Sequence, residues 1–295
     1  MVLIISGLAL GIASQVLDAL WKHRYHSTNW WLVLSLYGVG LLLLGFGNFL
    51  SWRGRQYAAQ ADAERILTDS KRDVLYLRAF RSDPATLWSR EGGPKTPEEQ
   101  LANVLRPFGN LVAIGRPGEK LPPPGAARIY TSDEEWKEIV TRQMQAARLV
   151  IIRAAVGENL FWELKQAVAT LCPQKILILV LKMKAKPYEC FRTDVNPMLS
   201  VSLPDAAMVR PRFGRVSGFI AFAPDWKPSF LRLRASYFRS GFYTAYLSSF
   251  KYALRPVFES FGLEWQPPPL RFVEKVLLPM AWILFVGLLV SLKLH

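Results

Sequence analysis

One stretch, residues 121–169, constrains the fold of this chain more than any other. Within it, Ser132 is followed three residues later by Glu135, a capping-box pattern that predicts a helix starting near Asp133. Apolar residues then recur at spacings of three and four, so one face of this helix must be buried. The next segment, residues 149–152, is a short apolar run rich in β-branched side chains, which is typical of a central strand covered on both faces. A helix followed directly by a buried strand indicates an α/β fold.

A second helix is expected after this strand, and the junction between them is a candidate site. Residues 153–159 lie where the carboxyl end of the strand meets that helix, the usual place for a ligand in an open parallel sheet. Glu163 follows about one turn into the helix, directly after Trp162. We therefore expect a carboxylate and an aromatic ring close to the crevice at this edge of the sheet.

The same alternation of strands and helices extends to both sides of this stretch. Thr96, with Pro97 and Glu99, forms a second capping box and predicts a helix that ends near Leu105. Short apolar runs bounded by turn residues predict four more strands, at residues 73–80, 110–115, 175–181 and 218–222. Because parallel strands are connected through helices, this order predicts a doubly wound, flavodoxin-like α/β domain with a parallel sheet over residues 73–227.

Two segments of this domain fit no strand or helix. Residues 116–127 contain four prolines, which predicts an ordered loop or a lid instead of a core element. Residues 183–215 are mixed in character and cannot be assigned from the sequence.

Three stretches nearly free of charge, residues 2–20, 30–50 and 276–292, have the length of about 17 to 25 residues that a bilayer requires of a helix. They predict two transmembrane helices within residues 1–52 and a third within residues 271–295. A cleaved signal peptide is the alternative for the first, but no basic segment precedes it and no small-residue cleavage site follows it, which favours a retained anchor.

Orientation follows from the basic residues near the second span. Five of them come soon after it, Arg53, Arg55, Arg65, Lys71 and Arg72, whereas only Lys22 and Arg24 lie between the first two spans. The positive-inside bias therefore places the α/β domain in the cytoplasm, as part of a multi-pass protein of the inner (cytoplasmic) membrane. Residues 53–72 are expected to form a helical stalk that leads from the membrane to the domain.

The net charge of +14 has a natural counterpart at such a surface, the anionic headgroups of the lipid bilayer. Residues 228–270 combine aromatic side chains with Arg and Lys and are expected to form an amphipathic helical segment. Such a segment packs on its own domain or lies in the headgroup layer, and we favour both over stacking on nucleic-acid bases.

Cys172 and Cys190 match no metal-ligand spacing, and in the cytoplasm they would be reduced. We expect them to be small buried hydrophobic side chains, and we expect neither a metal nor a bound cofactor.

The pattern resembles the Toll/interleukin-receptor (TIR) family over about half of the chain. Residues 74–83, an apolar strand with an aromatic and polar turn, resemble the first box of that family. Residues 116–143 resemble its second box and the helix that follows. Residues 149–152 and then 159–164 resemble the segment in which a tryptophan precedes a Glu-Leu pair on a helix.

The resemblance implies a TIR-like fold, assembly into a homo-oligomer through that domain, and a set of site residues. In catalytic members the helix glutamate supports cleavage of the bond between nicotinamide and ribose in NAD, which implies that Glu163 is catalytic and that NAD is a substrate. The implied substrate contacts come from the turn after the first strand, from the loop at residue 116 and from the edge of the central strand: Phe80, Arg81, Ser82, Asp83, Arg116, Arg153 and Trp162.

The chemistry of these side chains fits that role. Breaking the bond to a cationic nicotinamide passes through a ribosyl cation, which an anionic Glu163 would stabilise. Trp162 or Phe80 would stack on the departing ring, and arginines, Arg78 included, would hold the pyrophosphate through forked hydrogen bonds. A glutamate early in a helix is also favourable with the helix dipole alone, by about 0.3 to 1 kcal/mol, so a structural role stays open.

Three functions remain open. The chain is a membrane-anchored TIR-like effector or sensor that hydrolyses NAD in stress or antiphage signalling, a role that the resemblance alone implies. Alternatively, it is a non-catalytic receptor or scaffold that acts by self-association, or an effector whose spans perturb the membrane.

Overall fold

The computed structural model describes residues 73–78, 96–115, 125–132, 134–209, 214–233 and 245–267, with scattered positions between residues 15 and 57. The chain divides into two compact units, residues 1–62 with 121–124, and residues 63–120 with 125–295. In the first unit every described position is helical. Among the described residues, no helix combines the length and the apolar character needed to cross a bilayer. The expected spans and stalk lie largely, and residues 271–295 entirely, outside the described residues.

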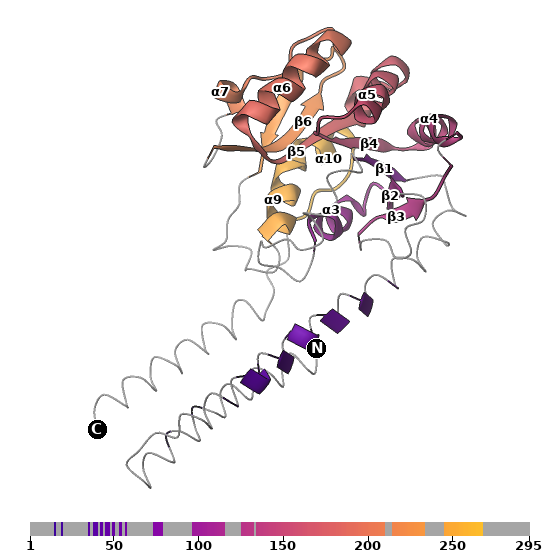
Figure 1. Cartoon of the computed structure of the whole chain (residues 1–295). Coiled ribbons are helices and arrows are strands. Elements are labelled where there is room, and N and C mark those ends of the chain that lie inside the picture. The colour runs from indigo at the N-terminus through magenta and orange to yellow at the C-terminus, as the bar shows by residue number, and fades with distance from the viewer. Residues whose placement is uncertain are drawn as a thin grey trace. The chain divides into compact units, whose positions relative to one another are not determined.

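The second unit is an α/β domain around a seven-stranded sheet (Figure 1). Its strands run in the order β3-β2-β1-β4-β5-β6-β7. The first five strands along the chain pair in parallel, whereas β6 and β7 are antiparallel to their neighbours. The strand bounds are β1 Val74–Leu77, β2 Leu111–Ile114, β3 Ala127–Ile129, β4 Leu149–Arg153, β5 Ile176–Lys184, β6 Arg215–Phe222 and β7 Pro228–Arg232.

The expectation of a parallel sheet is therefore wrong for β6, and β7 was not expected as a strand. The apolar run at residues 218–222 does form a strand, β6, but it pairs with β5 in the opposite direction, with Ile178 opposite Ile220. A continuous apolar run marks a strand that is covered by other elements, yet it carries no information on the direction of that strand. Direction depends on residues 183–215, which the sequence left unassigned.

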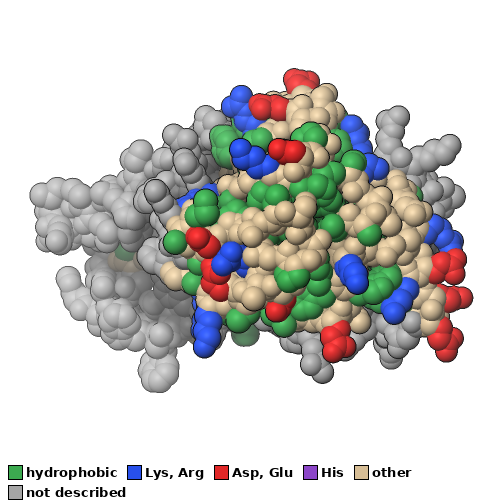
Figure 2. Space-filling view, turned by 90° about the horizontal axis from the view of Figure 1, so that it is seen from above, with side chains coloured by type: hydrophobic (Ala, Val, Ile, Leu, Met, Phe, Trp, Pro, Cys, Tyr) green, Lys and Arg blue, Asp and Glu red, His purple; other side chains and the backbone are tan. Residues whose placement is uncertain are grey.

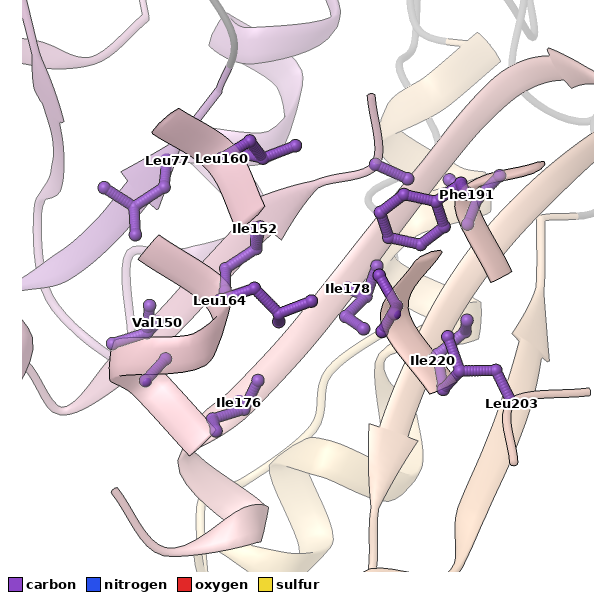
Figure 3. Close-up of a cluster of buried hydrophobic side chains, with 14 of the residues drawn as sticks. Leu77, Val150, Ile152, Leu160, Leu164, Ile176, Ile178, Phe191, Leu203 and Ile220 are labelled. Carbon is purple, nitrogen blue, oxygen red and sulfur yellow. The ribbon is translucent and has the colours of Figure 1, made fainter. Parts of the chain in front are cut away.

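One face of the sheet is covered by α4 (Trp136–Ala146), α5 (Glu158–Thr170), α6 (Ala185–Val195) and the short α7 (Ala206–Val209). In Figure 3, Leu160 and Leu164 of α5 lie against Leu77, Val150 and Ile152 of the sheet. These leucines occupy consecutive turns of one helix face, as a helix packed on a sheet requires. Two short 3₁₀ helices, η3 (Pro173–Lys175) and η4 (Asn196–Met198), complete this layer.

The other face is covered by α3 (Pro97–Leu105), α9 (Ala245–Ala253) and α10 (Arg255–Ser260). Here Phe108 contacts Phe258 edge to face, with ring centroids 4.8 Å apart. The side-chain oxygen of Gln100 accepts a hydrogen bond from the backbone of Leu247 at 2.8 Å, which ties α3 to α9. Because Phe250 and Phe258 are completely or almost completely buried, part of the aromatic segment packs on its own domain.

The helix starts follow their predicted caps to different degrees. Thr96 and Glu99 form the reciprocal capping box, with Pro97 in the first turn, so the prediction for α3 is confirmed from start to end. Ser132 does accept a hydrogen bond from the Glu135 backbone at 3.3 Å, but residues 134 and 135 form a turn. The helix α4 starts only at residue 136, later than the cap predicts.

The remaining differences concern β3, β7 and the cysteines. Residues 127–129, at the end of the predicted loop and after it, form a strand, and so do residues 228–232 at the start of the predicted helical segment. Cys172 and Cys190 are exposed free thiols, so the prediction that they are buried is wrong. Both cysteines face solvent, whereas Ile176 and Tyr188, nearby in the sequence, are the residues buried in the core.

Candidate functional site

The strand order reverses between β1 and β4, which makes their carboxyl ends the candidate site. After β1 the chain builds β2 and β3 on one side, and β4 then joins β1 on the other side. Helix α3 precedes β2 on one face of the sheet, and α5 follows β4 on the opposite face. In open α/β sheets, ligands bind in the crevice outside such a point, between the two departing helices.

Glu163 lies on α5, within the stripe of residues that faces the sheet. Its neighbours in this stripe, Leu160, Leu164 and Ala167, are buried, and Glu163 itself is only 5% exposed. Within the described part of the chain it forms no ion pair and no hydrogen bond through its carboxyl group. Burial without a partner raises the pKa of Glu163 to about 8. The side chain is therefore largely protonated and neutral at pH 7.

Trp162 precedes Glu163 on α5, and its ring contacts a second tryptophan. The rings of Trp162 and Trp136 have centroids 4.9 Å apart and are tilted by 47°. The ammonium group of Lys137 lies 5.5 Å from the Trp162 ring centroid, within range of a cation–π contact. Trp162 is half-buried and Trp136 is buried, with no hydrogen-bond partner for its indole nitrogen in the described part of the chain.

Arg153 is the last residue of β4 and lies on the opposite face of the sheet from Glu163. It is half-buried and shares a hydrogen bond with the hydroxyl of Tyr76 on the neighbouring strand. Burial raises the pKa of Tyr76 to about 12, Glu98 adds to this effect, and Arg153 and Arg78 oppose it. Tyr76 is therefore a neutral phenol at physiological pH.

Next to Arg153 on the same face is a buried group of three charges, which we call the arginine cluster: Arg78, Glu98 and Arg128. Glu98, in the first turn of α3, lies 3.2 Å from Arg78 Nη1 and 3.1 Å from Arg128 Nη2. The two arginine side chains are 3% and 0% exposed. Two buried guanidinium groups therefore share one carboxylate.

The sequence did not point to Glu98 or Arg128. They are 30 residues apart, and Arg128 follows the proline-rich segment that was expected to be a loop. The one available signal was the alternation of Ala127, Arg128 and Ile129, which is too short to predict a strand.

Of the predicted substrate contacts, Phe80, Arg81, Ser82, Asp83 and Arg116 lie outside the described residues. The described members do not form one group, since Glu163 and Trp162 lie on the α5 side of β4 and Arg153 lies on the α3 side. Within the described residues, no group of His, Cys, Asp and Glu side chains could hold a metal ion.

The surface above α5 and α6 shows how charge is distributed on one face. In Figure 2, Lys and Arg side chains on this face occur singly and alternate with Asp and Glu, with hydrophobic side chains between them. The described residues visible there form no continuous basic patch. The arginine cluster lies on the opposite face of the sheet, beside α3, which this view does not show.

No protein-family model matches the chain, and neither a characterised protein nor a solved structure is detectably similar to it. The functional argument therefore depends on the arrangement of these side chains.

Proposed function

We propose that this chain is a membrane-anchored, TIR-like effector that hydrolyses the nicotinamide–ribose bond of NAD in a stress or antiphage response. Its α/β domain would face the cytoplasm and assemble into a homo-oligomer, with three spans in the inner membrane near anionic headgroups. The observation that best supports an enzyme is Glu163, a carboxyl without an ion-pair partner in the described residues, on a helix that leaves the sheet at its switch point.

The chemistry assigned to Glu163 is electrostatic. When the glycosidic bond breaks, its electron pair goes to the nicotinamide nitrogen, which leaves as a neutral molecule, and positive charge develops on the ribose. A carboxylate close to that charge stabilises it. Water then adds to the ribose carbon, and Glu163 takes the proton that this water loses. NAD is a tractable substrate because its leaving group needs no proton.

The raised pKa fits this role once substrate charge is included. Without substrate, Glu163 is mostly protonated at pH 7, because its pKa is about 8. A bound nicotinamide ring carries a positive charge, which favours the anionic form of a nearby carboxyl. We expect Glu163 to release its proton to solvent as the already cationic nicotinamide binds, while Trp162 supplies an aromatic surface beside the ring.

The test uses the full chain in detergent or in lipid nanodiscs. NAD is added, and released nicotinamide is measured by chromatography. Release by the wild type, its loss in Glu163→Gln, and its retention in Glu158→Gln support the proposal, since Glu158 is an exposed residue of the same helix. If the wild type, clustered on membranes, leaves NAD intact, the hydrolase proposal fails.

The burial of Glu163 favours a second candidate function, a non-catalytic scaffold that acts by self-association. Glu163 is 5% exposed and lies in a helix stripe with Leu160 and Leu164, as expected for a residue that only packs. Mass measurement of the detergent-solubilised chain would then show an oligomer, and the same sample would release no nicotinamide from NAD.

A third alternative is an effector whose spans perturb the membrane. If toxicity on overexpression survives Glu163→Gln but is lost when a foreign anchor replaces the spans, membrane perturbation is the function instead.

A further inference from the structure

The arginine cluster contains a buried cation whose hydrogen-bonding capacity is mostly unused. Arg128 Nη2 donates to Glu98 at 3.1 Å, but Nε and Nη1 have no hydrogen-bond partner in the described part of the chain. The Arg128 side chain is 0% exposed. A buried hydrogen-bond donor without a partner costs free energy of folding, and the cost is larger when the donor belongs to a charged group. Native structures rarely contain such donors without a reason.

Arg128 shares its one charged partner among the described residues. Glu98 pairs with Arg78 as well as with Arg128. A buried positive charge is stable only when it is paired, because the protein interior cannot solvate it as water does. Anionic oxygens placed at Nε and Nη1 would complete the pairing of Arg128.

The surroundings add to the positive potential. Leu77 pairs with Ile152, so the residues that follow them, Arg78 and Arg153, leave neighbouring strands at the same level of the carboxyl edge. The start of α3 also lies here, because Glu98 is in its first turn, and a helix N-terminus carries partial positive charge. Strands β3, β1 and β4 therefore each bring a guanidinium group to one face of this edge.

We propose that this edge binds a phosphate group, with Arg128 as its principal contact through Nε and Nη1. A guanidinium fork matches two oxygens of a phosphate in geometry as well as in charge, which a lysine cannot do. In the absence of phosphate, Glu98 holds the two arginines and competes for Arg128. The inference that the phosphate is part of a nucleotide rests on the proposed function, whereas phosphate binding itself does not.

The experiment measures binding of inorganic pyrophosphate to the full chain in a zwitterionic detergent, by isothermal titration calorimetry at constant ionic strength. We expect saturable binding by the wild type and a loss of at least about tenfold in affinity for Arg128→Gln, since a hydrogen bond to a charged group has roughly this effect. Arg128→Lys keeps the charge but loses the fork, and should also bind weakly. The control, Arg142→Gln, removes an exposed arginine that pairs with Glu138 on α4, and should bind as the wild type does.

A second variant keeps the proposal testable if Arg128→Gln does not fold. Glu98→Gln removes the competing carboxylate and leaves both arginines, so pyrophosphate should bind more tightly and should raise the melting temperature more than in the wild type. The proposal is overturned if the wild type shows no saturable binding, if Arg128→Gln and Arg142→Gln bind equally, or if Glu98→Gln lowers the melting temperature without any response to pyrophosphate.

Two further arms identify the source of the phosphate and separate this site from the hydrolase. ADP that binds more tightly than pyrophosphate identifies a nucleotide, whereas a response to phosphatidylglycerol in nanodiscs, without one to ADP, identifies a lipid headgroup. If the chain binds pyrophosphate but releases no nicotinamide, the phosphate-site proposal stands and the hydrolase proposal fails. If the chain releases nicotinamide but binds no pyrophosphate, and pyrophosphate does not inhibit the release, the hydrolase proposal stands and the phosphate-site proposal fails.

Discussion

The substitution Glu163→Gln should stabilise the folded protein, and increasingly so as the pH rises. The pKa of Glu163 is raised in the fold from its ordinary value of 4.5 to about 8. Below pH 4.5 the carboxyl is neutral in both the folded and the unfolded chain and costs nothing. Between pH 4.5 and 8 the unfolded chain loses the proton while the folded chain keeps it, so stability falls with rising pH.

The magnitude follows from the pKa values. Each pH unit between the two values is worth about 1.4 kcal/mol. The wild type should therefore lose about 3 kcal/mol by pH 7 and on the order of 5 kcal/mol above pH 8, relative to acid conditions. Glutamine has almost the same shape and cannot ionise, so the variant should escape this loss.

The assay is urea unfolding of the full chain at pH 5, 7 and 8.5, followed by tryptophan fluorescence, to which Trp162 beside the substituted residue contributes. Glu158→Gln, on the exposed side of the same helix, is the control and should follow the wild type at every pH. We expect Glu163→Gln and the wild type to be nearly equal at pH 5 and several kcal/mol apart at pH 8.5. A difference that does not change with pH, or a variant less stable than the wild type at pH 8.5, would refute the reasoning.

Three more predictions follow from the same structure. If Glu163 is catalytic, kcat/KM for NAD should rise with pH and level off above about 8, because this ratio reports the free enzyme, and a profile flat from pH 6 to 9 would contradict the role. Glu98→Ala should lower the free energy of unfolding by about 3 to 5 kcal/mol, since it leaves two buried arginines without their carboxylate. Glu138→Ala, which breaks an exposed pair, should cost at most about 1 kcal/mol in the same urea titration. Gly125→Ala should cost about 1 to 3 kcal/mol, because its φ is +130° and a Cβ would lie 2.6 Å from the Glu99 nitrogen. At Gly157, whose Cβ would meet nothing within 4 Å, the same change should leave the melting temperature unaltered.

The parts of the fold that could be predicted are those that local physics determines. The capping box at Thr96 needs only residues three apart, and it fixed the start of α3. The strands β4 and β5 are continuous apolar runs because both of their faces are covered, and such runs stand out in any sequence. The burial of Glu163 was not visible, since a polar residue within an apolar helix stripe can face either a ligand or the packing.

The parts that could not be predicted depend on contacts between distant segments. The direction of β6 depends on the connection from β5 through α6 and α7. The residues of β6 alone do not indicate whether the strand is parallel or antiparallel. Glu98 and Arg128 each look like ordinary charged residues in the sequence. Their role as partners emerges only when α3 packs across β1 and β3. The charge of a residue is therefore a poor guide to its burial when its partner lies elsewhere in the chain.

The bond between Gln100 and Leu247 has a consequence for how the domain is made. It joins α3, the first helix among the described residues of the domain, to a segment 147 residues later. During synthesis, Phe108 and Phe219 therefore lack their ring contacts until Phe258 and Phe250 have left the ribosome, although the last strand ends at residue 232. A nascent chain that stalls before residue 245 would present to the cell the part of this apolar face that α9 and α10 cover, a target for chaperones and a seed for aggregation.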